Sequence, residues 1–193
     1  MSLQKIIKEN NRIIALWKNE ESLAELLKLM PHVSVSHIKS EKRKKEYLSV
    51  RILLHKLLPK STLSYNKYNA PELDEKQFIS ISHSDDLLAI MLSNKRIGID
   101  IEKISSKALQ VSSKFILNNK HDELSKEKAT LIWCCKEAIF KWYQKGDIDF
   151  KNDICLERFH IKEKGKIKAT LYNQKYTLNY TKLDNHFLVY VCK

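Results

Sequence analysis

Two carboxylates separated by a single residue could hold a cation. Residues 97–102 (IGIDIE) alternate as a strand does, with the isoleucines on one face and Gly98, Asp100 and Glu102 on the other. We expect the isoleucine face to be core and the carboxylates to leave together on the opposite face. Carboxylates roughly 7 Å apart on one strand face repel unless a cation lies between them, and Mg²⁺ prefers such oxygen ligands. A solvated outer strand face would show the same pattern.

A second set of reactive side chains follows helical spacing. Trp133, Glu137 and Lys141 are four residues apart, so they share one side of a helix. An acid and a base at this spacing usually form a surface ion pair, but this pair lies in an otherwise apolar run, LIWCCKEAIFKW. A largely covered glutamate needs a partner or a metal ion. Glu137 is therefore a candidate third carboxylate for the site of Asp100 and Glu102.

A serine and a histidine close a third segment, SISHSD. The alternation of residues 78–82 indicates a strand, and His83 is the first residue beyond it, where functional loops begin. A lone histidine more often has a structural role. A histidine beside Ser82 can also donate hydrogen bonds to a phosphate, so both interpretations stay open.

The elements that must position these residues include both helices and strands. Hydrophobic periodicity predicts helices over 17–30, 40–58 and 127–145. Period-two patterns predict strands over 78–82, 87–92 and 97–102, and several more in the last 30 or so residues. Helices and strands are segregated rather than alternating, which predicts an α+β fold.

Composition narrows the classes of protein. The 193 residues carry a net charge of +12, which attracts anionic partners, whether nucleic acid, polyphosphate cofactors or acidic proteins. No apolar run is long enough to span a membrane, and the first residues lack the pattern of a signal peptide. The four cysteines lack a zinc-binding spacing, so we expect free thiols in a cytoplasmic protein.

Three motifs in this order resemble the 4′-phosphopantetheinyl transferase superfamily, of the larger, surfactin-synthetase-activating type. They are SISHS at 80–84, GIDIE at 98–102 and WCCKEAIFK at 133–141. The basic segment 40–58 is similar to the N-terminal helix of that type, although the match is weaker. Each motif alone arises readily by chance, whereas three in order with suitable gaps form a specific signal.

The resemblance implies a pseudo-two-fold fold of two similar α+β halves, here 1–94 and 95–193, with the cofactor cleft between them. The second half would carry the Mg²⁺-binding motifs. The implied site residues are Asp100, Glu102 and Glu137 for Mg²⁺, Glu137 and Lys141 for catalysis, and Arg43, Arg51, Ser82, His83 and Lys141 for coenzyme A. The sequence departs from the family where G-K-P is usual, because Asn69-Ala70-Pro71 stands there without the lysine. Lys67 is the base that could replace it.

The implied reaction moves the 4′-phosphopantetheine arm of coenzyme A to a serine of an acyl or peptidyl carrier protein and releases 3′,5′-ADP. The base is either Glu137 or a Mg²⁺-bound water held by Glu137 or Glu102. Fatty-acid, polyketide and peptide-synthetase carriers all fit. We expect a monomer whose partners are coenzyme A and the carrier protein, with neither nucleic acid nor membrane.

Two alternatives remain at the level of sequence. A Mg²⁺-dependent nuclease could use an acidic cluster together with Lys136, and the basic charge would suit DNA. A basic nucleic-acid-binding module could hold the same acids for structural reasons. Neither explains His83 and Trp133 at their places in the order of the motifs.

Overall fold

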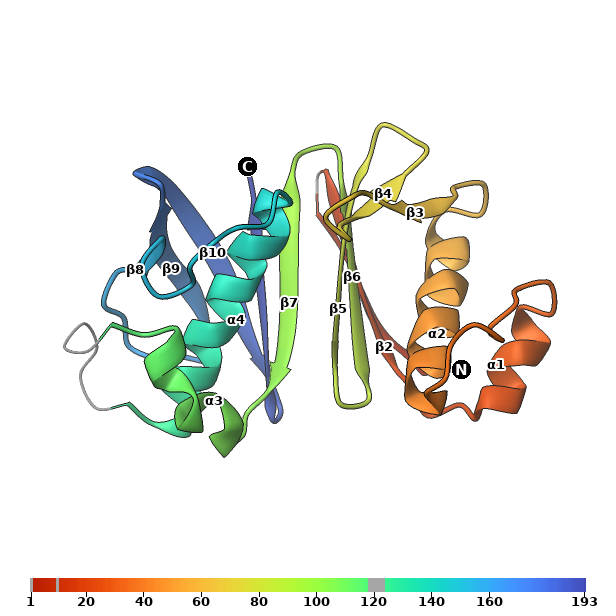
Figure 1. Cartoon of the computed structure of the whole chain (residues 1–193), viewed down its shortest axis with the longest axis horizontal. Helices are drawn as coiled ribbons and strands as arrows, with labels where there is room; N and C mark the ends of the chain where they lie inside the picture. Colours follow the sequence, from red (N-terminus) through yellow and green to blue (C-terminus); the bar gives the residue numbers. More distant parts are fainter. Residues whose placement is uncertain (1, 10, 118–123) are drawn as a thin grey trace. The chain divides into compact units, whose positions relative to one another are not determined.

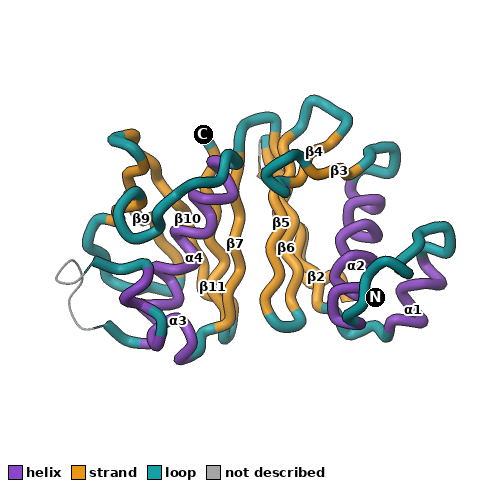
Figure 2. Tube along the Cα trace, in the orientation of Figure 1, coloured by secondary structure: helices purple, strands orange, loops and turns teal. Residues whose placement is uncertain are grey.

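The computed structural model describes residues 2–9, 11–117 and 124–193. The chain divides into two compact units, residues 1–94 and 95–193. Each unit combines an antiparallel sheet with helices, as expected for an α+β fold (Figures 1 and 2). Among the described helices, none has both the length and the apolar character needed to cross a bilayer.

The first unit is built on a four-stranded sheet with the order β1-β2-β6-β5. Its strands are β1 (Ser2–Glu9), β2 (Arg12–Lys18), β5 (Phe78–Ser84) and β6 (Leu87–Ser93), and a small hairpin joins β3 (Leu63–Tyr65) to β4 (Pro71–Leu73). Helices α1 (Leu23–Leu29) and α2 (Glu41–Leu57) lie together on one side of that sheet (Figure 1). The apolar core fills the space between α2 and the sheet, around side chains such as Leu53, Leu88 and Ile90.

The helix predicted over 17–30 is wrong over residues 17–22. Trp17 belongs to β2, and α1 begins only at Leu23, after Ser22 and Glu25 form a reciprocal capping box. The error has a physical cause. Four consecutive residues of β2, from Ile14 to Trp17, are buried, so the strand reads as a continuous apolar run without alternation.

The helix predicted over 40–58 is confirmed by α2. Ser40 is its N-cap and accepts a hydrogen bond from the backbone N–H of Arg43 at 3.5 Å. Val50 and Leu54 of the predicted apolar stripe are buried in the core of the unit. The predicted strands over 78–82 and 87–92 are confirmed by β5 and β6, which pair with each other.

The second unit has a five-stranded sheet with the order β7-β11-β10-β9-β8. Its strands are β7 (Ile97–Lys103), β8 (Ile154–Leu156), β9 (Lys164–Leu171), β10 (Gln174–Leu183) and β11 (His186–Cys192). Helix α4 (Lys126–Tyr143) packs against β7 and β11, and α3 (Ser106–Gln110) packs beside it, followed by the 3₁₀ helix η1 (Ser112–Lys114) (Figure 1). The predictions of β7, α4 and the late strands are confirmed, whereas β8, α3 and the β1–β2 hairpin were not predicted.

Helix α4 approaches β7 closely because Gly98 has no side chain. A Cβ atom at Gly98 would lie 2.0 Å from the carbonyl oxygen of Ala138 and 2.6 Å from the backbone nitrogen of Trp142. Both atoms belong to the backbone of the helix, so they cannot turn away. The sequence placed Gly98 on the same strand face as the carboxylates, and the structure shows that its lack of a side chain makes room for the helix.

We expect Gly98→Ala to lower the free energy of unfolding by about 3 kcal/mol or more, because the new methyl group must displace helix backbone. Gly165→Ala is the matched control. Its Cβ would lie 2.8 Å from the Tyr180 ring, a side chain that can shift, so the expected loss is about 1 kcal/mol. Urea unfolding of both variants measures the difference. Equal stability of Gly98→Ala and the wild type would contradict this account of the packing.

Candidate active site

The acidic face of β7 is covered by α4. Asp100 is opposite Val189 in the register with β11, and Val189 belongs to the apolar core beneath the helix. Side chains of paired strand residues lie on the same face, so Asp100 and Glu102 lie on the helix-covered face. The isoleucines of β7 are fully buried, as predicted, whereas the prediction that the carboxylates leave on an outer face is wrong. Asp100 is only 2% exposed, although Glu102 is partly exposed.

Long side chains of α4 join the two motifs. Trp133 and Lys141 are about 12 Å apart along the helix axis and Asp100 and Glu102 about 7 Å apart along the strand, so the lysine and indole side chains span the difference. Lys141 Nζ donates to Asp100 Oδ1 at 2.6 Å, and Trp133 Nε1 donates to Glu102 Oε1 at 3.3 Å. Glu137 stands between Trp133 and Lys141 on α4. The structure thus pairs Lys141 with Asp100 and Trp133 with Glu102, whereas a common metal site of the three acids stays a prediction.

The carboxyl of Glu137 is the most perturbed acid of this group. Burial is the main cause, and the Asp100 carboxylate adds to it, so that the pKa rises from 4.5 to about 7 despite the opposing charge of Lys141. Burial alone would lower the pKa of Lys141. The charge of Asp100 and its hydrogen bond outweigh burial, and the pKa of Lys141 is raised. Near neutral pH, Glu137 can therefore either hold or accept a proton, and Lys141 stays charged.

The acids suit a hard cation by type. Asp100, Glu102 and Glu137 supply only carboxylate oxygens, which are the protein ligands that Mg²⁺ takes. The mutual influence of these acids on the pKa of Glu137 is the repulsion that a cation would relieve. Across the described residues, no three acidic, histidine or cysteine side chains converge closely enough to hold a metal ion. In this structure the positive charge beside Asp100 is the ammonium of Lys141.

Ser82 and His83 lie within a strand rather than beyond one. Strand β5 continues to Ser84, so the prediction that His83 follows the end of the strand is corrected. Adjacent strand residues point to opposite faces. His83 therefore shares the α2-facing side with Ile81, whereas Ser82 is buried on the other side with Ser80. The Ser-His pair does not present both side chains on one face.

The two arginines of α2 differ in their surroundings. Arg51 lies over the ring of Tyr47, with its guanidinium carbon 3.3 Å from the ring centroid, and it donates to the Tyr47 carbonyl oxygen at 3.2 Å. Arg43 is exposed and pairs with Glu46 at 2.9 Å. Lys67, the suggested replacement for the missing lysine, lies over the ring of Tyr68 at 5.0 Å.

Lys136 is not part of the acidic cluster. It is 4% exposed and donates to the carbonyl oxygens of Ile154, at 2.5 Å, and Phe150. The nuclease interpretation needs this ammonium beside the carboxylates, and the structure directs it to backbone oxygens instead. That alternative is not supported.

Comparison with known proteins identifies the family. A sequence model described as the 4′-phosphopantetheinyl transferase superfamily matches residues 96–192, half of the chain. This chain belongs to that superfamily. Within the matched half lie Asp100, Glu102, Glu137 and Lys141, whereas the predicted coenzyme A residues of the first unit lie outside it.

Two curated phosphopantetheinyl transferases are similar over part of their length. The 4′-phosphopantetheinyl transferase gsp of Aneurinibacillus migulanus is 31% identical over 88 residues, which are 42% of this chain and 37% of that protein. The 4′-phosphopantetheinyl transferase Sfp of Bacillus subtilis (strain 168) is 32% identical over 93 residues, which are 45% of this chain and 41% of that protein. The matched segments thus span about two fifths of these relatives.

Sequence reasoning missed two determinants of this acidic site. The hydrogen bond from Trp133 to Glu102 could have been anticipated, because the indole N–H of a covered tryptophan usually finds a partner. The backbone contact at Gly98 had only the glycine itself as a signal, since nothing in the sequence shows which segment approaches it.

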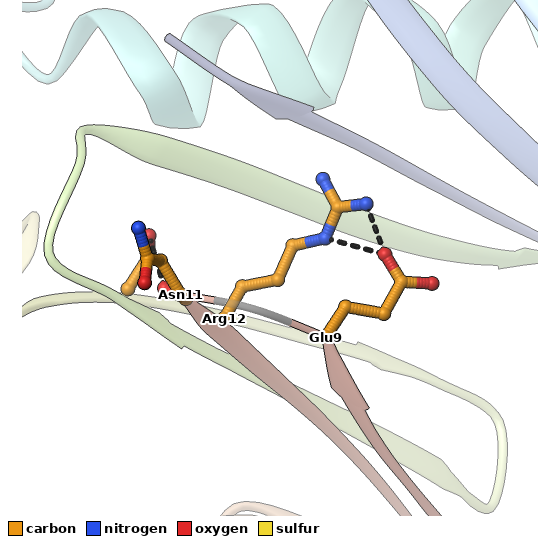
Figure 3. A network of polar contacts seen from close by, with 4 residues as sticks. Glu9, Asn11 and Arg12 are labelled. Atoms are coloured by element: carbon orange, nitrogen blue, oxygen red, sulfur yellow. Dashed lines mark hydrogen bonds and ion pairs between the residues drawn. The ribbon is translucent and has the colours of Figure 1, made fainter.

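A hollow of about 440 Å³ lies elsewhere, in the first unit, at the tip of the β1–β2 hairpin. Figure 3 shows its polar lining, where Arg12 donates to Glu9 and Ser93 Oγ donates to the Asn11 carbonyl oxygen at 3.0 Å. None of the predicted site residues lines this hollow.

The shifted pKa of Glu137 predicts a pH-dependent stability. The folded protein binds a proton that the unfolded chain releases between about pH 4.5 and 7, so the free energy of unfolding should fall as pH rises through this window. Glu137→Gln should abolish that fall and stabilise the metal-free protein above pH 7 by about 2–3 kcal/mol. Urea unfolding at several pH values is the measurement. As a control, Glu127→Gln on the same helix should keep the wild-type profile, and an unchanged profile in Glu137→Gln would refute the assignment.

Proposed function

We propose that this chain transfers the 4′-phosphopantetheine arm of coenzyme A to a serine of an apo acyl or peptidyl carrier protein, with release of 3′,5′-ADP. The observation that carries the proposal is the arrangement of the helix-covered acidic face of β7, where Lys141 contacts Asp100 and Glu137 has a pKa near neutrality. This arrangement lies inside the segment that matches the superfamily. The names of the two curated relatives support the same reaction.

The proposed metal site consists of Asp100, Glu102 and Glu137. When bound there, Mg²⁺ would neutralise charge on the pyrophosphate of coenzyme A. The three acids are hard oxygen donors held on two packed elements, β7 and α4. Their mutual repulsion gives a reason for binding a cation, and three carboxylates would leave positions of the Mg²⁺ octahedron for phosphate oxygens.

The chemistry proposed for the side chains follows from their charges. Glu137 is the proposed acceptor of the proton of the carrier serine hydroxyl. Its pKa of about 7 belongs to the metal-free site, and a bound cation would lower this pKa and keep the carboxylate ionised. The serine oxygen forms a bond to the β-phosphorus, and the bond from that phosphorus to the bridging oxygen breaks. Lys141 stays protonated and directs its positive charge toward the same phosphate oxygens. The proton stays on Glu137 until solvent removes it, and 3′,5′-ADP takes the bond electrons.

Lys141 has one proposed role before coenzyme A binds and another after it binds. In the structure its ammonium compensates the charge of Asp100, with 26% of the lysine side chain and 3% of the aspartate side chain exposed. Removing one partner from so covered a pair leaves a charge without compensation, which is costly. We propose that Lys141 turns from Asp100 to a phosphate oxygen when coenzyme A and the cation arrive.

Coenzyme A would also contact the first unit. The proposed residues are Arg43, Arg51, Ser82 and His83. Arg51 has the better-defined geometry, since its guanidinium is held flat on Tyr47. A guanidinium fixed in this way loses little side-chain freedom when it binds a phosphate. The net charge of +12 favours encounter with coenzyme A and with an acidic carrier surface.

The proposed reaction predicts that the protein, given coenzyme A, Mg²⁺ and an apo carrier protein, adds one phosphopantetheine to the carrier serine, as read by intact mass. Glu137→Gln should slow transfer roughly 10²- to 10⁴-fold, because it removes both a proton acceptor and a ligand. Asp100→Asn and Glu102→Gln should also slow it, and EDTA should stop it. Glu127→Gln, which loses a carboxylate of α4 that pairs with Lys182, should transfer at the wild-type rate. Full transfer by all three folded site variants, or in excess EDTA, would refute the site.

For the first unit, Arg51→Ala should raise KM for coenzyme A more than it lowers kcat, because Arg51 is assigned to a part of the substrate that does not react. A charge-assisted contact to phosphate is worth ~1.5–3 kcal/mol, which corresponds to roughly 10- to 150-fold in affinity. Lys42→Ala, an exposed position in the first turn of α2, is the matched control for loss of charge. Unchanged affinity of folded Arg51→Ala for coenzyme A, measured by calorimetry, would remove Arg51 from the binding site.

A further inference from the structure

Lys136 is a buried lysine whose ammonium is held by backbone carbonyls. Its residue is 4% exposed, and Nζ donates to the carbonyl oxygens of Phe150 and Ile154. Burying an ammonium is unfavourable unless its donors are satisfied. The hydrogen bonds of Lys136 therefore hold in place the segment of chain that supplies these carbonyl oxygens. That segment contains Phe150 and leads into β8.

The segment between α4 and β8, residues 144–153, has few regular hydrogen bonds of its own. It leaves the helix through Gln144 and Gly146, which have φ angles of 60° and 69°. Asp149 organises a local turn by accepting hydrogen bonds from the Lys151 backbone at 2.8 Å and the Asn152 side chain at 2.6 Å. These contacts shape the turn internally. Lys136 ties this part of the chain to α4 by donating to the carbonyl oxygen of Phe150 within the segment and to that of Ile154 at the start of β8.

The side chain of Phe150 connects this segment to the acidic face. Its ring packs on Trp133 with centroids 5.4 Å apart and on Phe140 with centroids 5.5 Å apart. Phe115 contacts another side of the Trp133 ring at 5.0 Å. Two neighbours therefore fix the orientation of the indole, and the indole N–H donates to Glu102 Oε1 at 3.3 Å. Moving Phe150 would remove one of the two supports.

We propose that Lys136 is a positioning residue for the acidic site: by holding the Phe150 segment on α4, it fixes the Trp133 indole against Glu102. The inference rests on the proposed function for the role of Glu102 as a metal ligand. The positioning of Trp133 by Lys136 through Phe150 follows from the contacts and does not depend on the proposed function. Partners of this kind commonly change metal affinity 10- to 100-fold when they are removed.

The position calls for a hydrogen-bond donor and not merely for volume. Methionine has nearly the length of lysine and fills the same space without a donor. Loss of the donor leaves buried carbonyl oxygens unsatisfied, at a cost of about 1–3 kcal/mol each, which is less than the free energy of unfolding of an ordinary domain. Lys136→Met should therefore fold, while the carbonyl oxygens of Phe150 and Ile154 lose their donor and the segment shifts.

The test compares Lys136→Met with Lys126→Met, an exposed lysine at the start of the same helix. The three tryptophans give three indole ¹H–¹⁵N resonances, and Trp133→Phe assigns that of Trp133. In metal-free Lys136→Met, we expect the Trp133 resonance to shift and its N–H to exchange faster, while that of Trp17 in the first unit stays in place.

In transfer assays, the Mg²⁺ concentration for half-maximal rate should rise roughly 10-fold, with KM for coenzyme A unchanged. Lys126→Met should match the wild type throughout.

A wild-type Trp133 resonance in folded Lys136→Met would overturn the proposal. If that variant does not fold, Phe150→Leu serves instead, because it keeps Lys136 and removes the ring that supports Trp133. It should shift the same resonance, and an unshifted resonance would overturn the proposal equally. A shifted resonance in a protein that transfers nothing from coenzyme A would leave the positioning intact and reject the proposed function.

Discussion

The contact between the backbone of α4 and the backbone of β7 sets the geometry on which the other features of the second unit depend. Gly98 permits it, since any side chain there would meet Ala138 and Trp142 backbone atoms. At this separation the side chains of the helix reach the strand, and Lys141 contacts Asp100 while Trp133 contacts Glu102. These helix residues are about 12 Å apart along their axis and the two acids about 7 Å apart along the strand, so the long lysine and indole side chains span the difference.

The same close packing has an electrostatic cost. Covering the acidic face removes water from Asp100 and Glu137, and their repulsion is visible in the raised pKa of Glu137. Two largely covered lysines of helix α4 have different kinds of partner. Lys141 compensates a carboxylate, whereas Lys136 satisfies main-chain carbonyls on another side of the helix. Two lysines of one motif thus have different roles, since Lys141 balances a charge and Lys136 places a loop.

The sequence was sufficient to predict elements with a clear hydrophobic period. It was also sufficient to predict which residues share one side of such an element. Alternation predicted β7, helical spacing predicted α4, and the common side of Trp133, Glu137 and Lys141 followed directly. The acidic face of β7 was assigned wrongly because isoleucines indicate an apolar environment but not which layer provides it, and here both faces are buried. Trp17 was misplaced for a similar reason, since a strand covered on both faces has no alternation to read.

The pairing order of the second sheet has a consequence for how the protein is made. Strand β7 has a single neighbour, β11, and Asp100 pairs with Val189 at the far end of this unit's sequence. Helix α4 and the strands β8 to β10 must all leave the ribosome before β7 can find its place. Assembly of the acidic face therefore waits for a long-range contact, which is intrinsically slow to form. A nascent chain stalled before β11 would hold every carboxylate of the site and still lack the sheet that aligns them.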